Sequence, residues 1–278
     1  MKTVSTLKEL FQARSELPGP VGLVPTMGFL HEGHLILMRQ AKQTCASVVV
    51  SIFVNPTQFG PGEDLESYPR DIDRDLSLLE HLGVDLVWLP TPEVMYPANY
   101  QTWVEVSDVT QPLEGRYRPG HFRGVTTVVS KLFNAVRPDV AVFGQKDAQQ
   151  VAVVMQMTRD LSYPIKIDVV PIVREGDGLA LSSRNIYLDK AQREAATVLY
   201  RSLRKAEAAY LQGERSAKAL RKIMTDTIET EPLAGIQYVS CADRSTLEEL
   251  ETVTDGALLS MAVYVGNTRL IDNWILEP

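Results

Sequence analysis

Two histidines three residues apart, His31 and His34, are the first residues of this sequence whose types and spacing suit chemistry on a phosphate. They lie in the segment PTMGFLHEGH, after an apolar run that predicts a strand and at the start of a run that predicts a helix. Side chains at this spacing project from one side of a helical turn, where imidazoles can donate hydrogen bonds to a triphosphate. An isolated pair of this kind more often caps a helix or packs against it, so the interpretation needs support from other segments.

The same segment favours a nucleotide over a metal ion. Gly28 and Gly33 let the backbone approach a ligand closely, and the amino terminus of the predicted helix offers unpaired N–H groups to an anion. The zinc-binding helix of metalloproteases carries its histidines four residues apart, whereas this pair is three apart and has no obvious third ligand.

Two further segments follow predicted strands and carry polar side chains suited to a small substrate. In NPTQFGPGEDLESYPRD, Gln58 could bind a hydroxy acid, because an amide both donates and accepts hydrogen bonds. In FGQKDAQQ, Lys146 offers a positive charge for phosphate, and Asp147 offers an acceptor for ribose hydroxyls or a metal. Gln150 supplies a second amide, and on neighbouring strand ends it would face the same substrate as Gln58. The alternative for both segments is an ordinary solvated loop.

Two glycine-flanked loops complete the set of candidates. GLALSSRN carries Ser182, Ser183 and Arg184, which could bind the β and γ phosphates, and its place near a predicted domain boundary suggests a closing lid. EGRYRPGHFRGV, residues 114–125, is basic, and it could cover an anionic site, pack against a partner subunit or be purely structural. These readings of the second loop stay open.

The elements that position these segments alternate between strands and helices. We expect an amphipathic helix near Leu7 to Arg14, strands at 21–24, 47–54, 85–89, 102–106, 140–143 and 165–173, and helices at 31–43, 71–81, 123–136 and 148–161. This alternation predicts an α/β fold with a Rossmann-like parallel sheet over residues 1–175, binding the nucleotide and the acid. Residues 176–278 predict a smaller α+β lid domain, with a long helix capped by Asp189 and reaching 212, a second helix from Ser216 to 230, and antiparallel strands.

Composition narrows the functional classes. The chain has 278 residues, 45% hydrophobic and 23% charged, and its net charge of −7 argues against a general nucleic-acid binder, which needs a basic face. Apolar runs are too short to cross a bilayer, and the amino terminus lacks the apolar region of a signal peptide. Cys45 and Cys241 form no ligand-spaced motif. We therefore expect a cytoplasmic enzyme with no membrane and no nucleic-acid partner.

Taken together, the motifs resemble the pantothenate synthetase (pantoate–β-alanine ligase) family. PTMGFLHEGH, NPTQF, YPRD, LEGRYRPGHFRGV, VFGQKDAQQ, LSSRN and VGNTRLIDN occur in the order of that family and span nearly the whole chain. HEGH also resembles the HxGH motif of the wider nucleotidylyltransferase superfamily, and LSSRN stands where class I synthetases carry a KMSKS loop.

The resemblance implies a ligase of pantothenate biosynthesis, the route to a coenzyme A precursor. Pantoate, ATP and β-alanine would give pantothenate, AMP and pyrophosphate through a pantoyl adenylate, with Mg²⁺ as the metal and a homodimer as the assembly. The implied ATP site comprises Met27, Gly28, Phe29, Leu30, His31, Glu32, Gly33, His34, Gly144, Gln145, Lys146, Asp147, Val173, Leu181, Ser182, Ser183 and Arg184. Gln58 and Gln150 would hold pantoate, with Gln58 also near β-alanine, and His34 would be the proton donor. Leu181 stands where the family carries Met, a change of similar volume that should preserve packing.

The catalytic hypothesis needs no base, because a carboxylate is already a nucleophile. His31, His34, Lys146 and Arg184 would neutralise charge as pyrophosphate leaves. No metal ligands are assigned, because the acids at 71–75 read equally well as a solvated helix face. The nearest alternative is a nucleotidylyltransferase acting on a phosphate ester, and a second is a nucleotide-binding regulatory module without catalysis.

Overall fold

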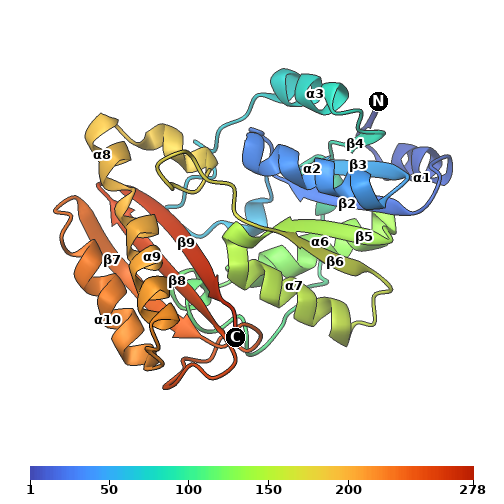
Figure 1. Cartoon of the computed structure of the whole chain (residues 1–278). Helices are drawn as coiled ribbons and strands as arrows, with labels where there is room; N and C mark the ends of the chain where they lie inside the picture. The colour runs from blue at the N-terminus through green and yellow to red at the C-terminus, as the bar shows by residue number, and fades with distance from the viewer.

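Six parallel strands form the sheet that carries most of the predicted site (Figure 1). The computed structural model describes all residues from 1 to 278. The strands are β1 (Lys2–Val4), β2 (Val21–Thr26), β3 (Ser47–Ile52), β4 (Leu86–Trp88), β5 (Val140–Gly144) and β6 (Lys166–Val170), in the spatial order β1-β4-β3-β2-β5-β6. From β2 the chain first builds outwards through β3 and β4, and then returns to the other side of β2 with β5. Such a switch point, at the carboxyl ends of the strands, is where open α/β sheets bind ligands.

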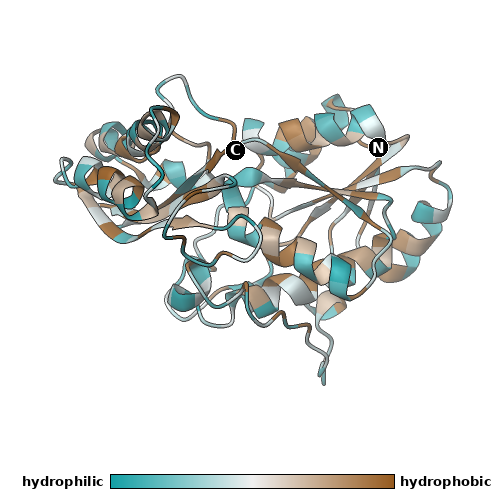
Figure 2. Ribbon diagram, turned by 60° about the horizontal axis from the view of Figure 1, so that its bottom comes forward, coloured by the Kyte–Doolittle hydropathy of each residue, from teal (hydrophilic) through white to brown (hydrophobic).

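Helices cover both faces of this sheet, as the nearly continuous apolar character of its strands requires. On one face lie α1 (Leu7–Ser15), α6 (His121–Val136) and α7 (Ala148–Asp160), and on the other lie α2 (Glu32–Thr44) and α3 (Ile72–His81). The alternating side chains of β3 pack on both faces. Val49 packs in the hydrophobic cluster with α1, α6 and α7, while Val48 and Val50 pack in the cluster with α2 and α3. In Figure 2 the strands are mostly coloured as hydrophobic, whereas the helices mix both colours. The predicted Rossmann-like parallel sheet is confirmed.

The last third of the chain forms the predicted α+β unit. Strands β7 (Ala234–Ala242), β8 (Ala257–Val265) and β9 (Thr268–Leu276) form an antiparallel sheet in sequence order. Helices α8 (Lys190–Ala195), α9 (Val198–Leu211) and α10 (Ala217–Ile228) contribute to the hydrophobic core of this unit. Short elements complete the chain: α4 (Pro92–Met95), α5 (Glu114–Tyr117), η1 (Pro56–Gln58), η2 (Gln145–Asp147) and η3 (Ser183–Tyr187). No helix of the structure has the length and apolar character needed to cross a membrane.

One predicted strand is absent, one short strand was missed, and one predicted helix is interrupted. The strand expected at 102–106 is irregular backbone that lies on α6, where the N–H of Val104 donates to Thr127 Oγ1 at 3.1 Å and its carbonyl accepts from Thr126 Oγ1 at 2.6 Å. Hydrogen bonds to side-chain hydroxyls thus replace the backbone hydrogen bonds that a neighbouring strand would make. The short edge strand β1 was missed, because its three residues carry no periodic signal.

The long helix expected from Asp189 to 212 is interrupted. Asp189 caps α8 with a capping box, as predicted, but the helix ends at Ala195 and α9 begins at Val198. At the break, the hydroxyl of Thr197 donates to the carbonyl of Glu194 at 2.8 Å, and this local bond competes with helix continuation.

Candidate active site

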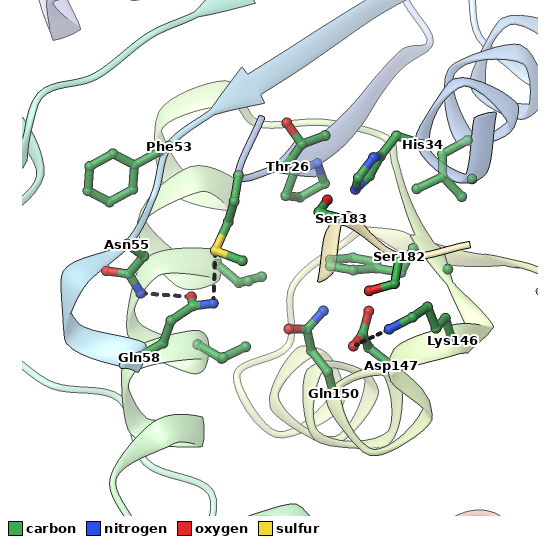
Figure 3. A pocket seen from close by; sticks show the side chains of 18 of the residues that line it. Thr26, His34, Phe53, Asn55, Gln58, Lys146, Asp147, Gln150, Ser182 and Ser183 are labelled. Carbon is green, nitrogen blue, oxygen red and sulfur yellow. Dashed lines mark hydrogen bonds and ion pairs between the residues drawn. The ribbon is translucent and has the colours of Figure 1, made fainter. Parts of the chain in front are cut away.

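One cavity lies at the carboxyl ends of β2, β3 and β5 and has a volume of about 230 Å³ (Figure 3). Segments far apart in the sequence reach it, from the β2–α2 turn to the LSSR loop. The predicted site residues in its lining are Met27, His31, Gly33, His34, Gln58, Gly144, Lys146, Asp147, Gln150, Val173, Leu181, Ser182, Ser183 and Arg184. The fold therefore brings most of the predicted site residues together around one space.

Five predicted residues lie outside this lining: Gly28, Phe29, Leu30, Glu32 and Gln145. Leu30 is buried in the core between the sheet and α2, and Glu32 is exposed and pairs with Arg39. Gln145 donates its amide to Asn273 Oδ1 at 3.1 Å.

The backbone N–H groups of the β2–α2 turn are also occupied. The carboxylate of Asp75, on α3, accepts from Phe29 N and from Leu30 N at 2.7 Å each, and it has no exposed surface. Gly28 and Phe29 both have positive φ, 83° and 50°, and Asp75 stabilises this tight turn. These two N–H groups therefore do not point to the cavity as the sequence had suggested for the turn.

His31 and His34 form the first turn of α2. His31 is the N-cap, its backbone N–H donates to His34 Nδ1 at 3.3 Å, and the two ring centroids are 4.1 Å apart. His34 thus does cap the helix, which was the cautious reading of the pair, yet its ring also lines the cavity. Both roles are compatible, because capping uses only one of its two nitrogens.

Burial keeps both imidazoles neutral. It lowers the pKa of His34 to about 3, with the neighbouring His31 and Lys146 acting in the same direction. It lowers the pKa of His31 to about 4, again with Lys146 as a contributor. Since Nδ1 of His34 is the acceptor, the proton of the neutral ring is on Nε2, which can then donate a hydrogen bond. The pair offers hydrogen bonds to an anion without adding positive charge.

Gly33 is required by the packing of this turn. A Cβ at that position would lie 2.9 Å from His31 Cε1 and 3.6 Å from Leu181 Cβ. Leu181 lies above the turn as an apolar side chain, and its N–H donates to the carbonyl of Val173 at 3.0 Å. The effect of leucine at position 181 stays a prediction.

The two glutamines extend into the same space from different elements (Figure 3). Gln58 is on η1 after β3, where its Oε1 accepts from Asn55 Nδ2 at 3.0 Å and its Nε2 lies 3.3 Å from Met27 Sδ. Gln150 is on α7 after β5. The expectation that their strands are neighbours is wrong, because β2 lies between β3 and β5. The two amides consequently flank the end of β2.

Neighbouring glutamines on α7 have different roles. Gln149 is buried, and its amide bonds the N–H of Glu114 and the carbonyls of Val109 and Pro112. The side-chain amide of Gln150 makes no hydrogen bond within the chain, so it is available to a ligand.

Lys146 and Asp147 border the cavity from η2. The Lys146 ammonium lies 4.0 Å from Asp147 Oδ1 (Figure 3). Asp147 is the one carboxylate in the lining, so cationic and neutral donors dominate there.

The LSSR loop is docked on the segment after η1. Arg184 donates to both oxygens of Asp64, from Nε at 3.0 Å and from Nη2 at 2.8 Å. Tyr187 OH donates to the carbonyl of Ser67 at 3.1 Å. These contacts tie the loop to the segment after η1 at one border of the cavity, and Arg184 is paired with Asp64.

The basic segment 114–125 forms a wall of the cavity within the same chain. Arg118 and His121 are in the lining, Arg118 pairs with Glu63, and His121 Nδ1 lies 2.7 Å from the carbonyl oxygen of Gln58. Glu114 accepts from Arg269 of the C-terminal sheet at 2.7 and 2.8 Å. Of the readings left open, bordering the site is the one that this geometry supports.

Several lining residues had no predicted role. Ser51 and Asn55 are buried polar residues on and after β3, and the Ser51 hydroxyl has no hydrogen-bond partner. A serine inside the otherwise apolar run SVVVSIFV was the available signal. Phe53 and Phe143 had no such signal, because aromatic residues at strand ends are usually core. Tyr68 lies between η1 and α3, in the YPRD segment.

Comparison with known proteins identifies the family of the chain. The sequence matches the pantoate–β-alanine ligase family over residues 1–275. The chain belongs to the pantoate–β-alanine ligase family. It is 55% identical over 277 residues to the pantothenate synthetase of Herpetosiphon aurantiacus, a match that covers 99% of this chain and 100% of the relative. It is 58% identical over 278 residues to the pantothenate synthetase of Chloroflexus aurantiacus, a match that covers 100% of this chain and 99% of the relative.

Solved structures of this family share the fold over the full length. Pantothenate synthetase from Thermus thermophilus superposes with a TM-score of 0.96 at 46% identity, covering 100% of both chains. The pantoate–β-alanine ligase of Francisella tularensis, described as complexed with β,γ ATP and β-alanine, superposes with a TM-score of 0.80 at 34% identity, covering 99% and 97%. The predicted enzyme class, a ligase of pantoate and β-alanine, is confirmed. The phosphate-ester alternative has no support from these matches.

Proposed function

We propose that the cavity carries out both half-reactions of pantothenate synthesis, activating pantoate with ATP and passing the pantoyl group to β-alanine. The observation that carries this proposal is one cavity lined both by phosphate-type donors, His34 and Lys146, and by two amides, Gln58 and Gln150. The ATP analogue and β-alanine described in the Francisella tularensis relative support the same substrates.

In the first half-reaction, a carboxylate oxygen of pantoate attacks the α phosphorus of ATP, and the bond to the bridging oxygen of pyrophosphate breaks. Lys146 supplies positive charge to the departing phosphates, while His34 Nε2–H donates a hydrogen bond. The neutral state of His34 makes it a hydrogen-bond donor in this step, and a full positive charge comes from Lys146 and Arg184.

In the second half-reaction, the amine of β-alanine attacks the carbonyl carbon of the pantoyl adenylate and AMP leaves. Gln58 and Gln150 hold the hydroxyl groups of pantoate on either side of the end of β2. No bond to the enzyme forms. The LSSR loop, docked on Asp64, excludes water from the mixed anhydride.

In this scheme, Asp64 and phosphate compete for the guanidinium of Arg184. Its guanidinium already donates two hydrogen bonds to Asp64, so its contribution to the β and γ phosphates requires exchange of that partner or use of its remaining N–H groups. Ser182 and Ser183, on the same loop, border the cavity and offer hydroxyls to the phosphates.

Magnesium fits this site as an ion that arrives with the triphosphate. No group of three His, Cys, Asp or Glu side chains is gathered to hold a metal ion anywhere in the structure. Mg²⁺ is commonly held by substrate phosphates, water and one or two carboxylates, and Asp147 is the carboxylate that borders the cavity. When bound, the ion would neutralise phosphate charge.

Three further features stay proposals from the sequence. The homodimer and the cytoplasmic location rest on the resemblance and the composition. The domain boundary near residue 175 falls in the irregular stretch between β6 and η3. Sedimentation of the purified protein at several concentrations would test the dimer.

The activity is tested by a coupled assay of AMP release. The proposal predicts AMP only when ATP, pantoate and β-alanine are all present, apart from slow hydrolysis of the adenylate without β-alanine. AMP release that does not depend on pantoate would contradict it.

A further inference from the structure

The motif VGNTRLIDN near the carboxyl end of the chain has no role in the site as described so far. It spans the turn into β9 and most of that strand. Three of its polar side chains bond to residues outside the C-terminal sheet: Arg269 to Glu114, Asp272 to Arg174, and Asn273 to η2. In Figure 1, β9 is the strand of its sheet that runs toward the parallel sheet.

Asn273 holds the turn that carries Lys146. Its Nδ2 donates to the carbonyl oxygens of Gln145 and Lys146, both at 3.0 Å, and its Oδ1 accepts from Gln145 Nε2 at 3.1 Å. The side chain is 3% exposed. Both donor hydrogens and the acceptor of this amide are used on two consecutive residues, so the bonds fix the position of the turn and its orientation.

Asn273 is itself held firmly on β9. Its N–H donates to Asp272 Oδ1 at 2.7 Å, and its carbonyl accepts from Arg174 Nη2 at 3.2 Å. Arg174 in turn donates to both oxygens of Asp272 and lies over the ring of Tyr200, 4.6 Å from its centroid. A rigid anchor of this kind transmits its position to whatever it binds.

Lys146, by contrast, is not held at its tip. Its ammonium lies 4.0 Å from Asp147 and makes no hydrogen bond to another side chain (Figure 3). The reach of this flexible side chain therefore depends on where its backbone is held.

We propose that Asn273 is a positioning residue, which fixes the backbone of Gln145 and Lys146 so that the Lys146 ammonium reaches the phosphates of ATP. The inference rests on the phosphate role proposed for Lys146. The active site of the parallel sheet is thus completed by an amide of the C-terminal sheet.

The test measures pantoate-dependent exchange of pyrophosphate into ATP for Asn273→Ala, Lys146→Ala and the double variant. We expect Asn273→Ala to lower kcat by about 10- to 100-fold, as a displacement near 1 Å can, with the KM for pantoate unchanged. If Asn273 acts through Lys146, adding Asn273→Ala to Lys146→Ala should lower kcat by less than about 2-fold more, since coupled residues are not additive. Independent effects that multiply in the double variant would overturn the inference.

A matched control separates positioning from loss of a bond between the two sheets. Tyr238→Phe removes the 2.9 Å hydrogen bond from Tyr238 OH, on the C-terminal sheet, to Glu114 Oε1 without touching η2, and should leave kcat unchanged. Because Asn273→Ala could unfold the protein, Asn273→Ser, which keeps one donor, serves as a second variant with an intermediate kcat. A folded Asn273→Ser or Asn273→Ala protein with wild-type kcat, beside a slow Lys146→Ala, would contradict the inference. A wild-type rate in Lys146→Ala would instead contradict the proposed role of Lys146.

Discussion

The two turns that bear the groups proposed to bind phosphate are held by different parts of the molecule. The β2–α2 turn, with its two histidines, is fixed by Asp75 on α3, a helix of the same parallel-sheet unit. The η2 turn, with Lys146, is fixed by Asn273 of the C-terminal sheet. The turn with the two histidines is thus held within the parallel-sheet unit, whereas the turn with Lys146 depends on how the C-terminal sheet docks.

The largest effect on activity should come from removing the side chains of Lys146 and His34. Lys146→Ala and His34→Ala should each slow adenylate formation by about 100- to 1,000-fold, the usual cost of one preorganised donor. Pantoate binding should change little, because Gln58 and Gln150 remain. Single-turnover assays with ATP and pantoate measure both quantities, and wild-type rates in both variants would refute these roles.

A smaller effect, on stability, tests the internal anchor of the histidine turn. Asp75→Asn should lower the free energy of unfolding by about 2 to 3 kcal/mol, because a buried carboxylate that accepts two N–H bonds becomes an amide that can accept only one. Asp73→Asn, an exposed acid on the same helix, should change it by less than about 0.5 kcal/mol. Chemical denaturation measures both, and equal effects of the two variants would refute the anchor.

Burial of the histidines also gives the stability a pH dependence. His31, His34 and His121 have pKa values lowered to about 4, 3 and 4 mainly by burial, so they are neutral in the folded protein and take up protons when it unfolds below pH 6.5. A lowered histidine pKa means that stability is full above pH 6.5 and falls as the pH drops toward 4. Unfolding midpoints between pH 7 and 4.5 should therefore decrease, and less steeply in His31→Asn. A flat profile would contradict the neutral pair.

The sequence predicted which residues meet at the sheet edge, because parallel strands end on one side and three of the motifs followed strands. Strand order was not predictable, since it depends on contacts between distant segments, and the neighbouring placement of Gln58 and Gln150 was therefore wrong. The sequence also contained no indication of the two residues that anchor the turns, Asp75 and Asn273. Asp75 bonds a turn 46 residues away, and Asn273 bonds one 128 residues away, so no local pattern marks either.

Local chemistry also explains where element predictions held. Asp189 and Ser216 cap helices as predicted, because a cap depends on residues within one turn. The strand predicted at 102–106 is absent because the backbone of this segment bonds two threonines of α6 and no neighbouring strand. That tertiary contact leaves no sign in the local sequence.

The exchange of labelled pyrophosphate into ATP without β-alanine is the most direct measurement of adenylate formation at the cavity. Pantoyl adenylate formation there predicts exchange that requires pantoate and falls at least about 100-fold in Lys146→Ala, in line with the loss of one preorganised donor. Exchange that proceeds equally without pantoate, or none at all in the presence of pantoate and Mg²⁺, would contradict this chemistry.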